Sequence, residues 1–431
     1  MNPRPLRFAM VSTFYPPYSF GGDAQAIRGL VHSLARRGHA VDVIHDINAY
    51  RMLSKGQEPE PLREPAGVRV HGLRSRMGSL SCLATHQLGH PVVHGARIRR
   101  ILNEGFDVIH YHNISLVGGP GVLAYGKAIK IHTSHEHWLV CPSHVLWRHN
   151  RELCDRKECL RCVLRFGRPP QLWRSTSLLE KKSRHVDAFV TFSQFCADKH
   201  REFGFDRPLS VLRTFLPDVG SIDASPPPRD DSSNQPPFFL FVGRLEMIKG
   251  LQDLIPHFDD GSTAELWIAG SGNYEAELRK CASRLPKVRF LGQRTPAELR
   301  VLYRKAVAAI LPSICYEVFP MVVLEAFREG TPIIARRLGP FPEIIAESRG
   351  GLLFETSDEL KKALVRMASD KPLRDSFARS ARQAFETLWS EDIALKEYLD
   401  LILKLAVRKG EETVSAKFAN AQELSDHGQT Q

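Results

Sequence analysis

The sequence predicts an α/β protein of two domains, each built on a parallel β-sheet. Short apolar runs alternate with longer amphipathic stretches along most of the chain, which is the pattern of parallel α/β sheets. One stretch interrupts this alternation, residues 217–237, which contain Pro226-Pro227-Pro228 and almost nothing to bury. The length of 431 residues, 43% of them apolar, is enough for two or three domains with cores of their own.

The apolar runs give the expected elements of both halves. In the first half we expect strands at Arg7–Val11, Ala40–Ile44, Val68–Gly72, Val108–His112, Lys130–His132, Ala188–Thr191 and Ser210–Leu212, with a helix over Ala24–Arg37. In the second half we expect strands at Phe238–Val242, Glu265–Ala269, Val288–Leu291, Val307–Leu311, Pro332–Ala335 and Leu352–Phe354. Helices are expected over Leu251–Phe258, Glu275–Leu285, Pro296–Ala306 and Pro320–Glu329, and from Pro372 to about Val407.

These patterns predict the domain boundaries. An N-terminal domain (1–216) and a linker (217–237) precede a second domain (238–385). A C-terminal helix (386–408) follows, for which a return to the N-terminal domain is one option, and then a flexible tail (409–431). Because ligands bind at the carboxyl ends of parallel strands, we expect a ligand in the cleft between the two sheets.

Charge and composition limit the class of protein. Residues 1–213 hold 31 Lys and Arg against 17 Asp and Glu, a net charge of +14, so the remaining 28 basic and 31 acidic residues give −3. A basic first half indicates an anionic surface or ligand, although a solvated basic face is an equally good explanation for any single residue. No apolar run reaches the ~18 residues of a membrane span, and the N-terminus lacks the pattern of a signal peptide. We therefore expect a soluble, cytoplasmic protein.

The strongest chemical signals lie in the second half. Pro320 suits the start of a helix, and no Ser, Thr, Asp or Asn directly precedes it, so the helix start is a candidate phosphate site. Glu325 lies inside an otherwise apolar helix and needs partners, such as sugar hydroxyls, whereas Glu317 precedes the helix. Salt-bridged or solvated glutamates are the alternative.

Two further segments end neighbouring strands. Arg244 follows the strand at Phe238–Val242, and Lys249 comes shortly after it, so both cations are candidates to hold a diphosphate. Gly270, in Ala269-Gly270-Ser271-Gly272, would let the backbone approach a ligand closely.

Taken together, the sequence resembles the family-4 retaining glycosyltransferases of group 1, which have a GT-B fold of two facing Rossmann-like domains. The matching segments are Val242-Gly243-Arg244-Leu245 with Lys249-Gly250, Ala269-Gly270-Ser271-Gly272, Phe290-Leu291-Gly292, Leu311-Pro312-Ser313, Glu317 to Glu325 with Phe319-Pro320, and Glu343. The resemblance covers Tyr15 to about residue 400. One departure is Gly339-Pro340-Phe341-Pro342 before Glu343, where the family usually has paired glycines.

The resemblance implies roles for these residues. Arg244 and Lys249 would bind the diphosphate of a UDP-sugar or GDP-sugar donor, and Glu325 the ribose hydroxyls. The segment from Glu317 through Val318, Phe319, Pro320, Met321 and Val322 would bind the transferred sugar. His135 would reach the donor sugar and Gly21-Gly22 would form a loop that closes on the donor, although taken alone the glycines fit a plain turn.

The catalytic residues implied are His135, Glu317, Arg244 and Lys249, and no catalytic metal is expected. The reaction would be sugar transfer to a hydroxyl acceptor with retention, the acceptor being a glycan or lipid-linked glycan of cell-surface polysaccharide synthesis. A nucleotide-sugar hydrolase or epimerase and an inactive sugar-nucleotide-binding scaffold are the alternatives.

Four cysteines gather in an arginine-rich segment of the first half, at about residues 141–162. Cys141, Cys154, Cys159 and Cys162 are candidate ligands for a structural zinc, which would order a loop with little to bury. Reduced thiols or a redox site are alternatives.

Residues 148–184 hold eleven Lys and Arg against four Asp and Glu, which suits a phosphorylated lipid carrier or an anionic membrane surface. Such a partner would place the protein peripherally on the inner face of the cell membrane. No nucleic-acid module is recognised, so no nucleic-acid partner is expected.

Overall fold

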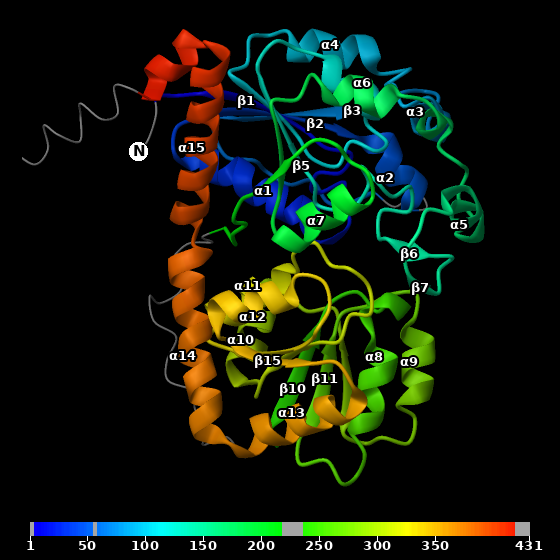
Figure 1. Ribbon diagram of the computed structural model, residues 1–431, viewed down its shortest axis with the longest axis vertical. Helices are drawn as coiled ribbons and strands as arrows, with labels where there is room; N and C mark the ends of the chain where they lie inside the picture. The colour runs from blue at the N-terminus through cyan, green and yellow to red at the C-terminus, as the bar shows by residue number, and fades with distance from the viewer. Residues whose placement is uncertain (1–3, 55–57, 218–235, 419–431) are drawn as a thin grey trace, which may run out of the picture. The chain divides into compact units, whose positions relative to one another are not determined.

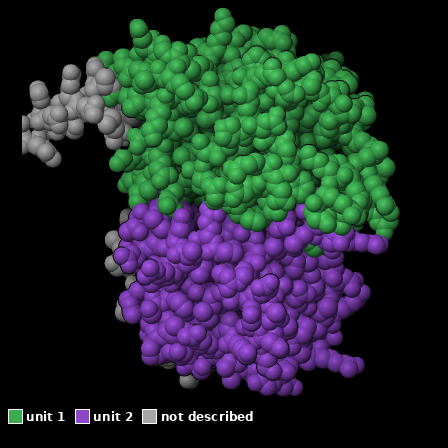
Figure 2. Space-filling view, in the orientation of Figure 1, with its two compact units in different colours: residues 1–150, 155–217, 391–431 green, residues 151–154, 218–390 purple. Residues whose placement is uncertain are grey.

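The computed structural model describes residues 4–54, 58–217 and 236–418. The chain divides into two compact units, coloured separately in Figure 2. The first unit consists of residues 1–150, 155–217 and 391–431, and the second of residues 151–154 and 218–390. Most of the expected linker, residues 218–235, lies outside the described residues.

The first unit is built on a seven-stranded parallel sheet in the order β3-β2-β1-β4-β5-β8-β9. Figure 1 labels β1, β2, β3 and β5 of this sheet. The strands are β1 (Arg7–Val11), β2 (Ala40–Asp46), β3 (Val68–Leu73), β4 (Val108–Tyr111), β5 (Ile129–Thr133), β8 (Ala188–Thr191) and β9 (Leu209–Val211). All residues of β4 and β5 are buried, as expected for the centre of a parallel sheet that is covered on both faces.

Helices connect these strands. They are α1 (Gly21–Arg36), α2 (Ile47–Leu53), α3 (Ser79–Leu88), α4 (Gly95–Leu102), α5 (Cys159–Arg165), α6 (Leu178–Ser183) and α7 (Gln194–Glu202), with the 3-10 turns η1 (Pro120–Ala124) and η2 (Leu172–Ser175). A helix from the far end of the chain, α15 (Glu391–Lys409), completes this unit. Its Tyr398 and Ile402 are buried in one core with Phe8 and Leu34, and Glu391 accepts from Arg36 at 2.7 Å.

The second unit has a six-stranded parallel sheet in the order β12-β11-β10-β13-β14-β15. The strands are β10 (Phe238–Val242), β11 (Glu265–Ala269), β12 (Val288–Gly292), β13 (Ala309–Leu311), β14 (Ile333–Arg336) and β15 (Gly351–Phe354). The helices are α8 (Leu251–Leu254), α9 (Glu275–Cys281), α10 (Pro296–Lys305), α11 (Met321–Arg328), α12 (Phe341–Ser348), α13 (Ser357–Ser369) and α14 (Lys371–Leu388), with the 3-10 turns η3 (Met247–Lys249) and η4 (Ile255–His257). Phe239, Leu266 and Ile334 lie in its core.

The strands expected from the sequence are all present, and the two-domain α/β fold is confirmed. Two features of the secondary structure differ from the expectations. A short hairpin, β6 (Trp147–Arg148) with β7 (Glu152–Leu153), forms inside the cysteine-rich segment. The long C-terminal helical stretch is broken between α14 and α15.

The flexible tail expected from residue 409 is wrong for its first part. Residues 412–418 are helical, and Val414 and Phe418, one helical turn apart, join the core of the first unit. Lys417 also forms an ion pair with Asp107 at 2.7 Å. Two apolar residues on one helix face are enough to dock a segment whose composition is otherwise polar. Residues 419–431 lie outside the described part of the chain.

None of the helices in the described residues has the length and apolar character needed to cross a membrane.

Candidate functional site

Two loops at the carboxyl ends of neighbouring strands close onto each other in the second unit. Leu245, after β10, donates its backbone N–H to the carbonyl oxygen of Ser271, after β11, at 2.9 Å. A Cβ atom on Gly270 would lie 1.9 Å from the Gly243 carbonyl oxygen, a distance that no side chain tolerates. The glycine is therefore required for contact between the loops, and its approach to a ligand stays a prediction.

A second close approach joins the loops after β10 and β13. Gly250 has a φ of 75°, and a Cβ atom there would lie 2.0 Å from the Pro312 carbonyl oxygen. Ile314 donates its backbone N–H to the Ile248 carbonyl oxygen at 2.9 Å. These contacts bring Lys249 and Glu317, which are 68 positions apart in sequence, to one place.

The centre of this site is an ion pair. Lys249 Nζ lies 2.6 Å from Glu317 Oε1, which also accepts from the Ser313 hydroxyl at 2.8 Å. The two charged side chains are 20% and 16% exposed, so water screens the pair little.

The ion pair lowers the pKa of Glu317 and raises the pKa of Lys249 relative to their ordinary values. Burial alone raises the pKa of Glu317, but the Lys249 ammonium and the hydrogen bonds from Lys249 and Ser313 outweigh it, so the net pKa is lowered. Burial lowers the pKa of Lys249, and the Glu317 carboxylate more than reverses this, so the net pKa is raised. Both groups are therefore charged at neutral pH.

Arg244 is the exposed cation of the site. Its side chain is 62% exposed and lies 2.7 Å from Glu246 Oε1, an ion pair that water screens well. Its charge contributes to the pKa shifts of both Lys249 and Glu317, which places it in their neighbourhood. The structure thus provides one buried, fixed cation and one exposed, adjustable cation.

The helix after Glu317 begins one residue later than expected. Pro320 is the N-cap residue, α11 starts at Met321, and no side chain caps this end. Val323 donates its backbone N–H to the Pro320 carbonyl oxygen at 3.0 Å. Val318 is buried, and Phe319 packs against Trp389 with a ring-centroid distance of 6.0 Å, so packing accounts for both side chains.

Glu325 has a partner that the sequence did not suggest. Its Oε2 accepts a hydrogen bond from the Tyr303 hydroxyl at 2.9 Å. Burial raises the pKa of Glu325, and the Tyr303 bond and the charge of Arg328 only partly offset this. Lys249 and Glu325 therefore have different partners in this structure.

In the first unit, Gly21 and Gly22 lie in a helix and not in a loop. They are the first two residues of α1, whose N-cap residue, Phe20, makes no side-chain cap. The loop runs from Tyr15 to Phe20 instead, and Tyr15 pairs with Tyr18 across it. The glycines thus form a helix N-terminus after β1, and their contact with a donor stays a prediction.

His135 is half-buried and ends a row of histidines at the ends of β4 and β5, in which His110 and His112 are buried. Its Nε2 lies 3.0 Å from Nδ1 of His112, and the His112 ring lies 4.0 Å from that of His110. His110 in turn bonds Thr133 and the Tyr398 hydroxyl of α15, at 2.7 and 2.9 Å. Burial lowers the pKa of His135 to about 4, although Glu136 opposes this. The imidazole is therefore neutral at pH 7 and suited to hydrogen bonding.

The cysteine segment does not show an assembled metal centre. Cys141 and Cys162 are buried, whereas Cys154 and Cys159 are half-buried. Within the described residues, three metal-ligand atoms come within 4.8 Å of one another at a different place, the buried group His137, Cys196 and His200. Two of these lie one turn apart on α7, a pairing that the sequence analysis missed. Zinc at the four cysteines stays a prediction.

Two family models match the chain. Glycosyltransferase Family 4 matches residues 20–216, and Glycosyl transferases group 1 matches residues 227–384. The two matches follow one another along the chain and together span most of it. The chain is a group 1, family-4 glycosyltransferase. This confirms the resemblance seen in the sequence.

Relatives and solved structures agree with this family. A glycosyltransferase of Methanocaldococcus jannaschii is 25% identical over 93% of this chain and 99% of its own. The lipopolysaccharide core biosynthesis glycosyltransferase LpsE of Rhizobium meliloti is 24% identical over 51% of this chain and 65% of its own.

Among solved structures, the sucrose-phosphate synthase of Thermosynechococcus elongatus has a TM-score of 0.69 at 19% identity, over 93% of this chain and 100% of that one. Anabaena HepE in complex with UDP and glucose has a TM-score of 0.61 at 18% identity, over 95% and 100%. These structural neighbours, together with the two parallel-sheet units, identify the fold as GT-B.

Proposed function

We propose that this glycosyltransferase moves a sugar from a nucleotide diphosphate donor to a hydroxyl acceptor, with retention at the anomeric carbon. The observation that carries the proposal is the buried Lys249–Glu317 pair, joined by Ser313 and neighboured by Arg244 at the carboxyl ends of β10 and β13. UDP is the first donor nucleotide to test, because the structural neighbour HepE was solved in complex with UDP and glucose.

The two cations would act on the leaving diphosphate. In the reaction the bond between the anomeric carbon and the diphosphate oxygen breaks, and the acceptor oxygen bonds to the same face of the sugar. The acceptor proton passes to the leaving phosphate oxygen, so that no carboxylate nucleophile is required. Lys249 stays protonated because Glu317 raises its pKa, and Arg244 is exposed enough to turn from Glu246 onto phosphate.

The two glutamates would hold hydroxyl groups. Both hydrogen bonds to Glu317 end on Oε1, so we assign Oε2 to a hydroxyl of the transferred sugar. Tyr303 bonds Oε2 of Glu325, and we assign Oε1 to the ribose hydroxyls. His135 belongs to the other unit, and its role toward the donor sugar is part of this proposal.

We further propose a glycan or lipid-linked acceptor of cell-surface polysaccharide synthesis, in keeping with the name of the Rhizobium relative. A membrane-surface location is favoured by α5. Leu160 and Leu164 are 63% and 59% exposed one turn apart, and the exposed Arg161 and Arg165 lie beside them. Exposed leucines flanked by arginines suit an anionic bilayer surface. If the protein co-sediments equally with neutral and with anionic liposomes, this location is rejected.

The decisive experiment is donor turnover by the full chain. Melting temperature is measured with UDP-glucose, UDP-galactose and GDP-mannose, because a bound donor stabilises the protein. Products are then analysed with and without a glycan acceptor, and their anomeric configuration is read by NMR. Lys249→Met should reduce turnover by about 10²-fold, whereas Lys280→Met, at a side chain 73% exposed, should not. Donor cleavage that no acceptor accelerates would indicate a hydrolase. Donor binding without any turnover would indicate a scaffold.

A further inference from the structure

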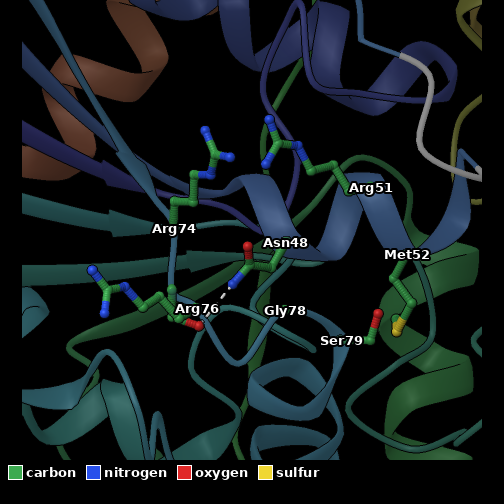
Figure 3. A pocket seen from close by; sticks show the side chains of 8 residues that line it. Asn48, Arg51, Met52, Arg74, Arg76, Gly78 and Ser79 are labelled. Atoms are coloured by element: carbon green, nitrogen blue, oxygen red, sulfur yellow. Dashed lines mark hydrogen bonds between the residues drawn. The ribbon is translucent and has the colours of Figure 1, made fainter.

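A pocket in the first unit is lined by residues to which no role has been assigned above. It has a volume of about 510 Å³ and is lined by Asn48, Arg51, Met52, Arg74, Ser75, Arg76, Gly78 and Ser79. These residues come from α2, which directly follows β2, and from the loop between β3 and α3 (Figure 3). The pocket is therefore at the carboxyl edge of the sheet, where parallel α/β sheets bind ligands.

The pocket is strongly basic. Arg51, Arg74 and Arg76 line it, and in Figure 3 the guanidinium groups of Arg51 and Arg74 extend to the same side, whereas that of Arg76 extends away from them. Within the residues that the structure describes, neither Arg74 nor Arg76 has an acidic partner at ion-pair distance. Gly78 and Ser79 are the N-cap and first residue of α3, so the positive end of that helix dipole adds to the field.

One carboxylate already lies beside these arginines. Glu58 forms an ion pair with Arg51 and accepts from the Tyr18 hydroxyl at 3.4 Å. The Arg51 hydrogen bond lowers the pKa of Glu58, and the charge of Arg74 adds to this effect, which places Arg74 near the same carboxylate. Three positive charges against one negative charge leave two that the chain itself does not neutralise.

The chemistry of the pocket limits the classes of ligand that it can bind. Guanidinium groups bind tetrahedral oxyanions through paired hydrogen bonds, which a single carboxylate satisfies only in part. Pockets of roughly 300–1,000 Å³ hold ligands much larger than a phosphate ion. The Asn48 side chain is held by Ser75 and Ser81, at 3.0 and 3.1 Å, so it forms a rigid polar wall beside the arginines.

From this geometry we infer that the Arg51–Arg74–Arg76 pocket binds the phosphomonoester of a sugar-sized group, and that this group belongs to the acceptor. The second part rests on the proposed transferase function, in which the second unit holds the donor. The phosphomonoester has two possible sources, a soluble sugar phosphate or a lipid headgroup, and the experiment below separates them.

The test measures binding by calorimetry, using the full chain with glucose 6-phosphate, glucose, and phosphatidylcholine vesicles with and without phosphatidic acid. We expect at least one phosphorylated probe to bind, and glucose and plain vesicles not to bind. Binding of the sugar phosphate identifies the soluble source, and binding of phosphatidic acid alone identifies the lipid. If neither phosphorylated probe binds, the inference is wrong.

Variants assign the binding to this pocket. The double variant Arg74→Ala/Arg76→Ala, at exposed positions, should weaken phosphate binding by roughly tenfold or more. Arg97→Ala/Arg100→Ala removes the same charge from exposed positions of α4 and serves as the control. Equal losses in the two double variants would show nonspecific attraction and overturn the inference.

Glu58→Gln provides a test that a damaged fold cannot imitate. Removing the competing carboxylate should tighten phosphate binding severalfold, and weaker binding would overturn the inference.

Donor turnover separates this inference from the proposed function. Arg244→Ala should reduce donor turnover without changing phosphate binding, and Arg74→Ala/Arg76→Ala should leave turnover without acceptor unchanged. If Arg244→Ala instead abolishes phosphate binding, the probe occupies the donor site and the pocket assignment is wrong.

Discussion

Breaking the Lys249–Glu317 pair provides the sharpest test of the candidate site. In Lys249→Met the Glu317 carboxylate keeps the Ser313 hydrogen bond but loses its counter-charge, while its side chain is only 16% exposed. Removing one partner of a buried ion pair costs about 3–5 kcal/mol. Because both side chains retain some contact with water, we expect a loss of about 3 kcal/mol in the free energy of unfolding.

Replacing both partners should cost less than the single change. Lys249→Met/Glu317→Gln leaves no buried charge, so we expect a loss of about 1 kcal/mol, which is smaller than the loss in Lys249→Met alone and far from the sum of the two single changes. Urea denaturation measures all four proteins. A loss below about 0.5 kcal/mol in Lys249→Met, or additive single changes, would refute the buried pair.

The pH dependence of the free energy of unfolding provides an independent test of the ion pair. The pKa of Glu317 is lowered in the folded protein, so its contribution is present above the ordinary value of 4.5 and is lost as the pH falls through the folded pKa. In Lys249→Met, burial dominates and the folded pKa of Glu317 should lie above 4.5. The stability difference between wild type and variant should therefore shrink as the pH is lowered from neutral to below 4.5. A difference that grows with acidity would contradict this sign.

Three further changes test other contacts. Tyr303→Phe removes the hydrogen bond that restrains the pKa of Glu325, so calorimetry should show donor binding weakened by roughly tenfold at pH 7 and more at lower pH; unchanged binding would exclude Glu325 as a donor contact. Gly270→Ala should destabilise the protein by roughly 2 kcal/mol or more in urea, because its Cβ atom meets the Gly243 carbonyl oxygen. Elemental analysis should find stoichiometric zinc that Cys159→Ser removes. Zinc retained in Cys159→Ser but lost in His200→Ala would move the site to the buried histidine and cysteine group.

Strands were predictable because each carries its own signal. Phe238–Val242, Glu265–Ala269 and Ala188–Thr191 have the same bounds in sequence and structure, since each consists mostly of apolar residues. The β6–β7 hairpin was missed because its strands have two residues each, too few to show a period. The break before Glu391 was missed because helical periodicity continues on both sides of it.

The candidate site was predictable as a set of residues but not as a set of contacts. Arg244, Lys249, Glu317 and Glu325 can be named from their places after strands and within helices. Their partners are fixed by tertiary packing, as for Tyr303, which lies 22 positions before Glu325 on another helix. The role of Gly270 also depends on a loop far away in sequence.

The position of α15 affects how the polypeptide matures. The last long helix fills the core beneath β1, where Leu395, Tyr398 and Ile402 are each at most 5% exposed. Residues 1–217 leave the ribosome long before this helix, so their apolar face stays open until α15 has been synthesised. The second unit, by contrast, is nearly continuous between residues 236 and 390 and has all of its strands when Gly351–Phe354 emerges. The half that is synthesised first is thus the half that finishes folding last.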